Sequence, residues 1–337
     1  MTDAATRRRR FRRDLAATVN GRARRAPALA RDYATLPELA SEAPREIRVA
    51  PYAGRDRWVT GMAEHLAANA GGDLLGAYVH GSLGSGDAVA YSDFDALVVL
   101  SDAAFASPRR LARAARMLNR ARRFMVGLDP LQHHGWFVLS EADLRCWPEG
   151  YFPSVLFEHS RSLLPGRGER LVAASRTEPG EARSAFDALA RSVSEPLEGG
   201  WRPAHQYALK ALLSRFMLLP TLYVQARDGA GVWKADSFAL AAADVDPEAW
   251  DAMDRASALR RAWTVDLTAV QRRALRLPSR LGDEVRKRWP VPIPDALAPH
   301  LDAELYAGMV RLAHALRRRL DDAPTAAAPA RRPLQLS

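Results

Sequence analysis

Cysteine is almost absent from this sequence of 337 residues. The single cysteine, Cys146, cannot close an intramolecular disulfide, and no Cys-x-x-Cys pair or Cys/His cluster offers a zinc site. The longest apolar stretch, residues 208–224, is interrupted by charged side chains and a proline, which excludes a membrane span. No signal peptide is visible. These absences predict a soluble, cytoplasmic protein without a membrane partner.

Lysine is also scarce, because only three of the 49 basic residues are lysines, at positions 210, 234 and 287. Nine arginines and two acids lie within residues 1–25, so this segment carries +7 of the net charge of +10. Such runs are typical of solvated, disordered tails, and they can also bind the phosphates of nucleic acids. We therefore expect an arginine-rich arm, with nucleic acid as its candidate partner, on a nearly neutral body.

Hydrophobic spacing predicts an α/β region in the first half of the chain. Apolar residues at helical spacing predict helices over 55–69 and 107–126, the second with Ser107 as its N-cap. Short apolar runs predict buried strands, expected over 74–80, 93–100, 134–140 and 154–164. The segment 81–86 is rich in glycine and serine and is expected to be a loop.

The pattern changes to long helical segments after residue 166, and no strand of comparable strength is expected there. These helices are expected over 181–193, 204–226, 235–243, 247–263, 267–287 and 294–320. The fold class is therefore an α+β domain with a small mixed sheet, followed by an all-α domain. The expected boundaries are an arm and linker at 1–50, disordered in part, the α/β domain at 51–165, the helical domain at 166–320 and a disordered tail at 321–337.

A pair of aspartates follows a glycine-serine segment in the α/β region. Gly81 and Ser82 follow the first predicted strand, and Asp93 and Asp95 open the next one. Residues two apart in a strand point to the same face, so the two carboxylates are expected side by side. Adjacent carboxylates repel each other unless a cation lies between them, and oxygen ligands suit Mg²⁺ or Mn²⁺. A structural doublet at a turn is the alternative.

The glycine-serine segment suits phosphate binding. Gly81 lets the backbone approach an anion because it has no Cβ, and Ser82 with the amides that follow can donate hydrogen bonds to phosphate oxygens. With metal ions on Asp93 and Asp95, this segment could hold the triphosphate of an NTP. The arrangement suits attack of an acceptor hydroxyl on the α-phosphorus, with pyrophosphate leaving.

This stretch of sequence resembles the nucleotidyltransferase domain of the DNA polymerase β superfamily, most of all its minimal and aminoglycoside-modifying members. The resemblance covers about residues 55–164 in motif and only the general order of elements beyond. It implies that Gly81 and Ser82 form the phosphate loop. It also implies that Asp93 and Asp95 bind the metal ions of a two-metal transfer reaction.

The family has a third acid on the next core strand, and this sequence departs from that pattern. The third predicted strand carries no acid, and His134 occupies the expected position. Imidazole is a competent general base, but it is a poorer ligand for Mg²⁺ than for Mn²⁺ or softer metals. His133, Asp129 and Glu158 are the alternatives for this role, and loss of catalysis together with the third acid is another.

Two of the three lysines are candidates for contact with the triphosphate. In the resembling enzymes, basic residues of the helical domain reach the triphosphate, which implies this role for Lys210 and Lys234. For each of them, a surface lysine without such a role is the alternative.

The leading hypothesis is a metal-dependent nucleotidyltransferase that moves a nucleoside monophosphate, AMP from ATP, to a hydroxyl acceptor. A small-molecule acceptor is favoured over RNA or protein. Two other classes remain open. One is a nucleotide-binding or regulatory protein of the same fold that has lost turnover, and the other is an RNA-directed protein that uses its arginine-rich arm.

Overall fold

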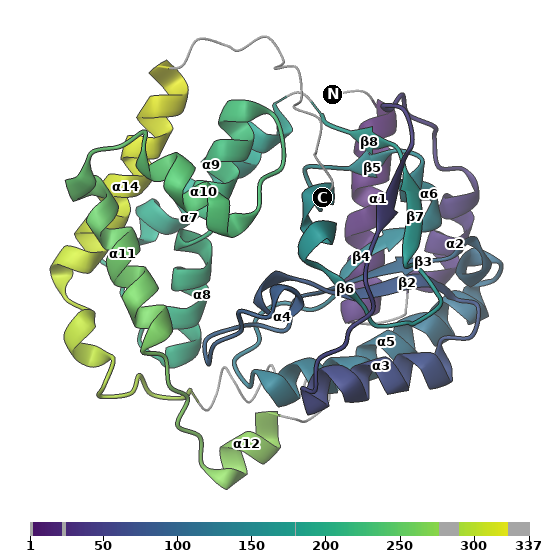
Figure 1. The fold of residues 1–337 in the computed structure, drawn as a ribbon, viewed down its shortest axis with the longest axis horizontal. Coiled ribbons are helices and arrows are strands. Elements are labelled where there is room, and N and C mark those ends of the chain that lie inside the picture. The colour runs from purple at the N-terminus through teal and green to yellow at the C-terminus, as the bar shows by residue number, and fades with distance from the viewer. Residues whose placement is uncertain (1–2, 22–24, 179, 276–289, 323–337) are drawn as a thin grey trace. The chain divides into compact units, whose positions relative to one another are not determined.

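The chain forms two compact units, which the computed structural model describes over residues 3–21, 25–178, 180–275 and 290–322 (Figure 1). The first unit contains Met1–Pro148, Leu156–Arg176 and Asp266–Val291, and the second contains Glu149–Val155, Thr177–Val265 and Pro292–Ser337. A mixed α+β region at about 45–176 is followed along the chain by an all-helical region at 181–322. The predicted fold class is therefore confirmed.

A four-stranded mixed sheet forms the core of the first unit. Its order is β4 (Phe137–Ser140), β3 (Ala96–Leu100), β2 (Leu74–Val79) and β6 (Arg161–Ser162). β2 pairs antiparallel with β3 and with β6, whereas β3 and β4 run parallel. Every residue of β3 is buried, which is the pattern of an inner strand that is covered on both faces.

Two helices with sequence-encoded caps cover one face of this sheet. Helix α3 (Arg57–Asn69) begins at Asp56, whose carboxylate accepts hydrogen bonds from two amides of the first turn. Helix α5 (Pro108–Leu128) begins at Ser107 with a proline in its first turn, as the sequence predicts. The caps determine where each helix starts, and the apolar face of each helix then packs on the sheet.

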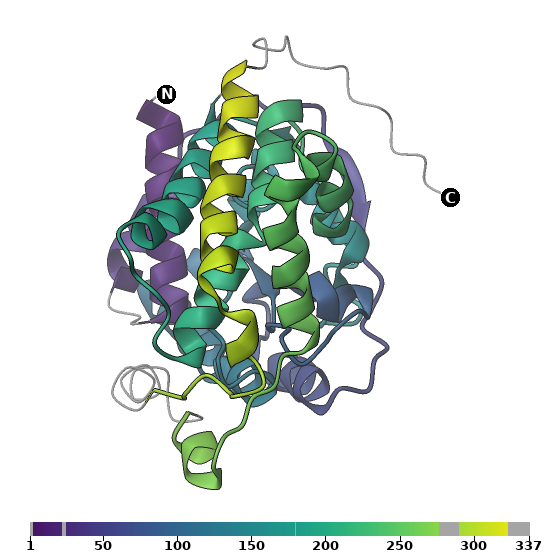
Figure 2. The ribbon, with the colours of Figure 1, turned by 90° about the vertical axis from the view of Figure 1, so that its left-hand side faces the viewer.

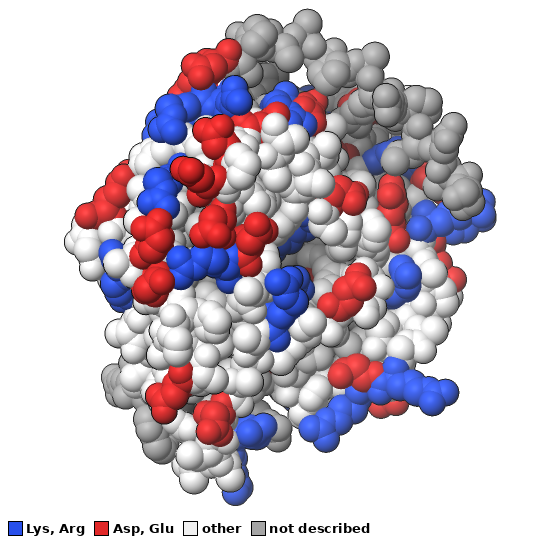
Figure 3. Space-filling model, turned by 60° about the vertical axis from the view of Figure 1, so that its left-hand side comes forward, with Lys and Arg blue, Asp and Glu red and all other residues white. Residues whose placement is uncertain are grey.

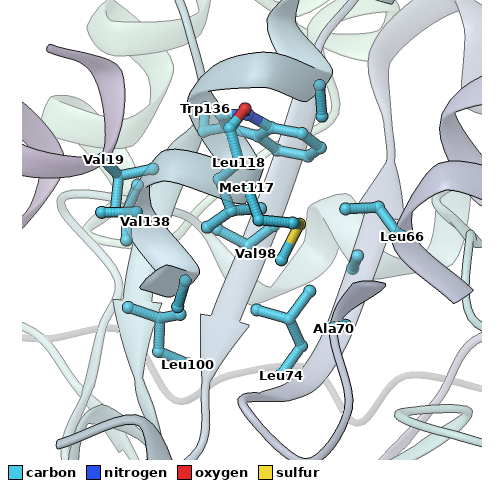
Figure 4. Close-up of a cluster of buried hydrophobic side chains, with 14 of the residues drawn as sticks. Val19, Leu66, Ala70, Leu74, Val98, Leu100, Met117, Leu118, Trp136 and Val138 are labelled. Carbon is cyan, nitrogen blue, oxygen red and sulfur yellow. The ribbon is translucent and has the colours of Figure 1, made fainter. Parts of the chain in front are cut away.

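The core of the first unit lies between these helices and the sheet (Figure 4). Leu66 of α3 and Leu118 of α5 are fully buried there. They belong to one apolar cluster with Val98 of β3 and Val138 of β4. Burial of a side chain of this size stabilises the fold by about 1.5–3 kcal/mol.

The N-terminal segment folds as helices, which corrects the expectation of a partly disordered arm. Helices α1 (Asp3–Asn20) and α2 (Ala26–Ala34) both contribute to the apolar core. Phe11, Leu15 and Val19 lie four residues apart on α1, so they share one face of that helix, and they are buried among residues of the core. The high charge of the segment masks this apolar stripe, which is why the sequence suggests a tail.

Two arginines of α1 are buried together with an aspartate. Arg8 Nη1 lies 3.7 Å and Arg12 Nη1 3.3 Å from Asp143 Oδ1. The other oxygen of Asp143 accepts hydrogen bonds from the amide and the hydroxyl of Ser140, at 2.9 and 2.7 Å. Ser140 is the last residue of β4, and Asp143 belongs to the short helix α6 (Glu141–Leu144) that follows it. The two arginines therefore hold α1 against α6.

Two short two-stranded sheets complete the first unit and correct two expectations. β1 (Arg45–Arg48) pairs with β7 (Arg170–Ala173), and β5 (Trp147–Pro148) pairs with β8 (Ser175–Arg176). Strands therefore occur after residue 166, where none is expected. The strand expected over 154–164 is instead a 3₁₀ helix, η3 (Ser154–His159), followed by the short β6. Strands of two to four residues are too short to show a clear alternation of apolar residues.

The second unit is helical (Figure 2). Its main helices are α7 (Glu181–Glu198), α8 (Gln206–Phe216), α9 (Leu219–Asp228), α10 (Lys234–Ala242), α11 (Pro247–Arg261) and α14 (Ala303–Asp322). α14 packs against α7 and α11. The single helix expected over 204–226 is two helices, because Pro220 lies in the first turn of α9 and cannot continue the ladder of α8.

Two expectations concern segments that extend beyond the described residues, namely a helix and the C-terminal tail. The helix expected over 267–287 is seen as α12 (Ala269–Leu275), and its remainder lies outside the described residues. The tail expected at 321–337 also lies outside them, apart from the last residues of α14. No helix among the described residues is both long enough and apolar enough to cross a membrane.

Candidate functional site

The candidate site lies at one end of the strands of the core sheet, at the edge where β3 and β4 both begin. These strands are parallel, and Leu97 is paired with Phe137. The residues that precede each strand therefore meet at the same edge, Asp93 and Asp95 from one segment and His133 and His134 from the other. The two aspartates lie just before β3 rather than within it, which corrects the expected start of this strand at residue 93.

The two carboxylates and the two imidazoles are close together. His134 Nε2 lies 3.0 Å from Asp95 Oδ1 and 3.9 Å from Asp93 Oδ2. His133 Nδ1 lies 3.4 Å from Asp93 Oδ1. Both carboxylates thus approach a single nitrogen, so they lie side by side as their spacing predicts. All four side chains are partly exposed.

The charges of this cluster depend on one another. Burial alone would lower the pKa of His134, but the carboxylates of Asp95 and Asp93 raise it to about 9. Burial alone would likewise raise the pKa of Asp95, but His134 holds it below its ordinary value. At neutral pH the imidazolium of His134 therefore offsets one of the two carboxylate charges. A protonated imidazole cannot accept a proton, so His134 can act as a base only when another cation balances these carboxylates.

A third histidine stands behind the cluster. His80 precedes the glycine-serine segment and is buried, with its ring 5.3 Å from that of Phe137. Burial lowers its pKa to about 4, an effect that Asp95 opposes and His134 reinforces. His80 is therefore neutral at physiological pH and adds no charge to the site.

Position 81 requires glycine. Its φ is +63°, and a Cβ at this position would lie 2.6 Å from Asp95 Oδ2. Any other side chain would combine backbone strain with displacement of the carboxylate. The expected loop is in fact a short helix, α4 (Gly81–Ser85), whose first residue lies against Asp95.

Ser82 is tied to the segment that connects α4 with the aspartates. Its hydroxyl donates a hydrogen bond of 2.8 Å to Ser92 Oγ, and that oxygen also accepts one from the amide of Val89. Ser82 therefore orders the connecting segment. Its oxygen lone pairs remain available to a donor, and its hydroxyl could turn to a phosphate only by releasing Ser92.

Gln132 holds the site together, and the sequence does not reveal this role. Its Oε1 accepts a hydrogen bond of 2.9 Å from the amide of Phe94, and its Nε2 donates to the carbonyl oxygens of Phe94, at 3.2 Å, and of His134, at 3.0 Å. The side chain of Gln132 thus links the backbone of Phe94 to that of His134, in the way that hydrogen bonds between paired strands would. The sequence around Gln132 contains no motif that indicates this structural role.

Replacing Gln132 with leucine should destabilise the protein by about 2–3 kcal/mol, because the amide and carbonyl of Phe94 would lose their partner while buried. Urea denaturation of the purified variant would measure the loss. Gln271→Leu is a suitable control, since among the described residues the side chain of Gln271 bonds to the exposed Thr268 and its loss should cost less than about 1 kcal/mol. Equal stabilities for the two variants would argue against the role of Gln132.

The other carboxylates considered for the third acid do not join the cluster. Asp129 is buried at the end of α5, and its Oδ1 accepts a hydrogen bond from the amide of Leu131, which is a turn contact. Glu158 is exposed on η3. Among the described residues, the group whose ligand atoms lie close enough to hold a metal is Asp93, His133 and His134.

The two candidate lysines both belong to the helical unit. Lys210 is fully buried on α8, and Lys234 is partly buried as the first residue of α10. The carbonyl oxygen of Lys234 accepts a hydrogen bond from Ser237, which tightens the first turn of that helix. Contact of either lysine with a triphosphate stays a prediction.

The donor set fits a divalent cation. One ligand atom each from Asp93, His133 and His134 lies within 4.8 Å of the others, and Asp95 adds a further carboxylate beside His134. Carboxylates bind Mg²⁺ and Mn²⁺, whereas imidazole favours transition metals. The cluster is therefore better suited to Mn²⁺ than to Mg²⁺.

Comparison of the chain with models of known families, with curated proteins and with solved structures found no significant match.

Proposed function

We propose that this protein is a metal-dependent nucleotidyltransferase, which transfers AMP from ATP to a hydroxyl acceptor and releases pyrophosphate. The observation that carries the proposal is the approach of two carboxylates to one imidazole nitrogen beneath a glycine that has no room for a Cβ. A fold requires no such concentration of ionisable groups at a sheet edge, whereas phosphoryl chemistry does.

In this proposal each group has a distinct role. Asp93 and Asp95 would hold divalent metal, which when bound neutralises charge on the phosphates and activates the oxygens that attack and leave. Gly81 and Ser82 would contact the β- and γ-phosphates. The acceptor oxygen forms a bond to the α-phosphorus while the bond to pyrophosphate breaks. His134 would orient the acceptor hydroxyl or take its proton.

A direct experiment can test the reaction. The protein is incubated with each α-labelled NTP, with Mg²⁺ or Mn²⁺, and with a fractionated cell extract, and both pyrophosphate and labelled products are measured. We expect pyrophosphate release with ATP and label in the small-molecule fraction. No release with any metal, nucleotide or fraction would overturn the proposal.

A second candidate is a nucleotide-binding or regulatory protein of the same fold. It is favoured by one observation, namely that histidines and not a third carboxylate complete the cluster among the described residues. Calorimetry separates the two candidates. Binding of ATP with Mn²⁺ in the absence of any pyrophosphate release would support the regulatory protein.

His134 should control both the rate and the choice of metal. We expect His134→Ala to lower the rate of transfer about 100-fold if the imidazole acts on the acceptor hydroxyl. His134→Asp should raise the ratio of Mg²⁺-supported to Mn²⁺-supported activity, because it exchanges an imidazole for a carboxylate. Initial rates with each metal measure both effects, with the exposed His300→Ala as a control. Unchanged rates would argue against a role of His134 in the transfer.

A further inference from the structure

Helix α5 carries a row of arginines along its exposed face. Arg109, Arg113, Arg116, Arg120 and Arg123 are all exposed. They follow one another at intervals of three or four residues, so they project from a single side of the helix. At 1.5 Å per residue the row is about 21 Å long, with one guanidinium per turn. We call these five residues the arginine row.

Most of the arginine row lacks a carboxylate partner. Arg113 Nη2 lies 3.0 Å from Asp73 Oδ2, and this buried aspartate also binds Arg110, which lies beside the row. Arg123 lies over the ring of Phe124. Arg109, Arg116 and Arg120 make no ion pair with any of the described residues. Helix α5 has no acid of its own, so among the described residues Asp73 balances only part of its charge.

The charge of the chain is concentrated in this part of the fold. Helix α1 has six arginines and two acids, and α5 has seven arginines and no acid, so together they carry +11. The chain as a whole carries +10. The remainder is close to neutral, and the face drawn in Figure 3 shows basic and acidic side chains interspersed. Each helix has two arginines bound to a buried aspartate, but α1 also has two acids of its own and α5 has none, so more of the net charge lies on α5.

The surroundings of the row favour a phosphate backbone over a lipid surface. A helix that lies on a membrane inserts apolar side chains beside its basic ones. The large apolar residues that are exposed in the described part of the chain lie elsewhere, none of them on α1 or α5. Guanidinium groups bind phosphates through paired hydrogen bonds, and regular spacing along a line suits a polymer with one phosphate per repeat.

The row also has a defined direction in the fold. Helix α5 connects the parallel strands β3 and β4, so its C-terminal end returns to the edge where both strands begin. The row therefore runs from the opposite edge of the sheet, at Arg109, towards the edge of the candidate site, at Arg123. A polymer bound along it would have one end near that site.

We propose that the arginine row is a docking surface for a nucleic acid strand, held through its phosphate backbone. The proposal concerns binding and does not depend on the proposed transfer reaction. It replaces the N-terminal arm as the element that would contact nucleic acid. A backbone contact reads neither base nor sugar, so RNA and DNA strands should bind with similar affinity.

The test compares two triple variants of the full chain. The first is Arg109→Gln, Arg116→Gln and Arg120→Gln. The control is Arg191→Gln, Arg261→Gln and Arg318→Gln, which removes the same charge from exposed positions of the helical unit. Fluorescence anisotropy with a labelled single-stranded oligonucleotide of about 16 nucleotides measures Kd between about 50 and 200 mM salt.

We expect the row variant to bind at least tenfold more weakly, with the slope of log Kd against log salt reduced by about 2. The control variant should stay within about twofold of the wild type. A third variant, with lysine in place of the same three arginines, should retain most of the binding, because a backbone contact needs mainly the charge. Circular dichroism of each variant establishes that the fold is intact.

Three results would overturn the proposal. The first is a wild-type protein that does not bind at low salt. The second is an equal loss of affinity in the row and control variants, which would show that only total charge matters. The third is preferential binding of the wild type to anionic phospholipid vesicles that is lost in the row variant, since this would assign the row to a lipid surface.

Discussion

Replacing Asp93 with asparagine should abolish transfer, lowering the rate by at least about 1000-fold, while the protein remains folded. The amide has nearly the shape of the carboxylate but no charge, so it cannot balance a divalent cation or the imidazolium of His134. The side chain of Asp93 is 11% exposed and also lies beside His133, so the substitution affects the centre of the cluster. Pyrophosphate release measures the rate, and Mn²⁺ binding measured by calorimetry should weaken in parallel.

The control for this substitution is Asp87→Asn, which removes the charge of an exposed aspartate in the segment between α4 and β3. We expect its rate to equal that of the wild type. Thermal unfolding should be nearly the same for both variants. A rate at the wild-type level for Asp93→Asn would contradict the proposed function. Loss of metal binding in a protein that never shows transfer would instead support the nucleotide-binding alternative.

The second large effect is expected at Gly81. Alanine there would place a Cβ 2.6 Å from Asp95 Oδ2, so the carboxylate that contacts His134 would have to shift. We expect the rate of transfer to fall at least about 100-fold, because small displacements of reacting groups are costly. Strain at positive φ should also destabilise the fold by about 1–2 kcal/mol.

Gly86 separates these two effects. It ends the same short helix with φ of +90°, but a Cβ there would meet nothing within 4 Å. Gly86→Ala should therefore lose a similar amount of stability and keep its activity. Urea denaturation and initial rates of both variants make the comparison. If Gly86→Ala loses as much activity as Gly81→Ala, the effect comes from the backbone of α4 and not from contact with Asp95.

The elements that carry the candidate site follow closely from the sequence. Ser107 and the proline after it determine the start of α5, and the apolar runs of β2 and β3 are long enough to identify both strands. The spacing of Asp93 and Asp95 also places their carboxylates side by side, although the strand begins after them. These features depend on local patterns, which is why one sequence is sufficient to find them.

The remainder depends on contacts between distant residues. Gln132 bonds to Phe94, which is 38 positions earlier, and no local pattern indicates such a pairing. The apolar stripe of α1 is present in the sequence, but its burial depends on β4 and α5, which begin almost 90 or more residues later. The charge of a segment is therefore a weak guide to its disorder when every fourth residue is apolar.

The anchoring of α1 also has a consequence for the synthesis of the chain. Arg12 binds Asp143, which is 131 positions later, so the arginine is made well before its partner. At about 5–20 residues per second, the ribosome takes about 7–26 s to bridge that interval. For most of this time Arg12 lacks Asp143, and the apolar stripe of the helix lacks β4, against which it packs. The nascent first unit can close only after the short helix that follows β4 has been made.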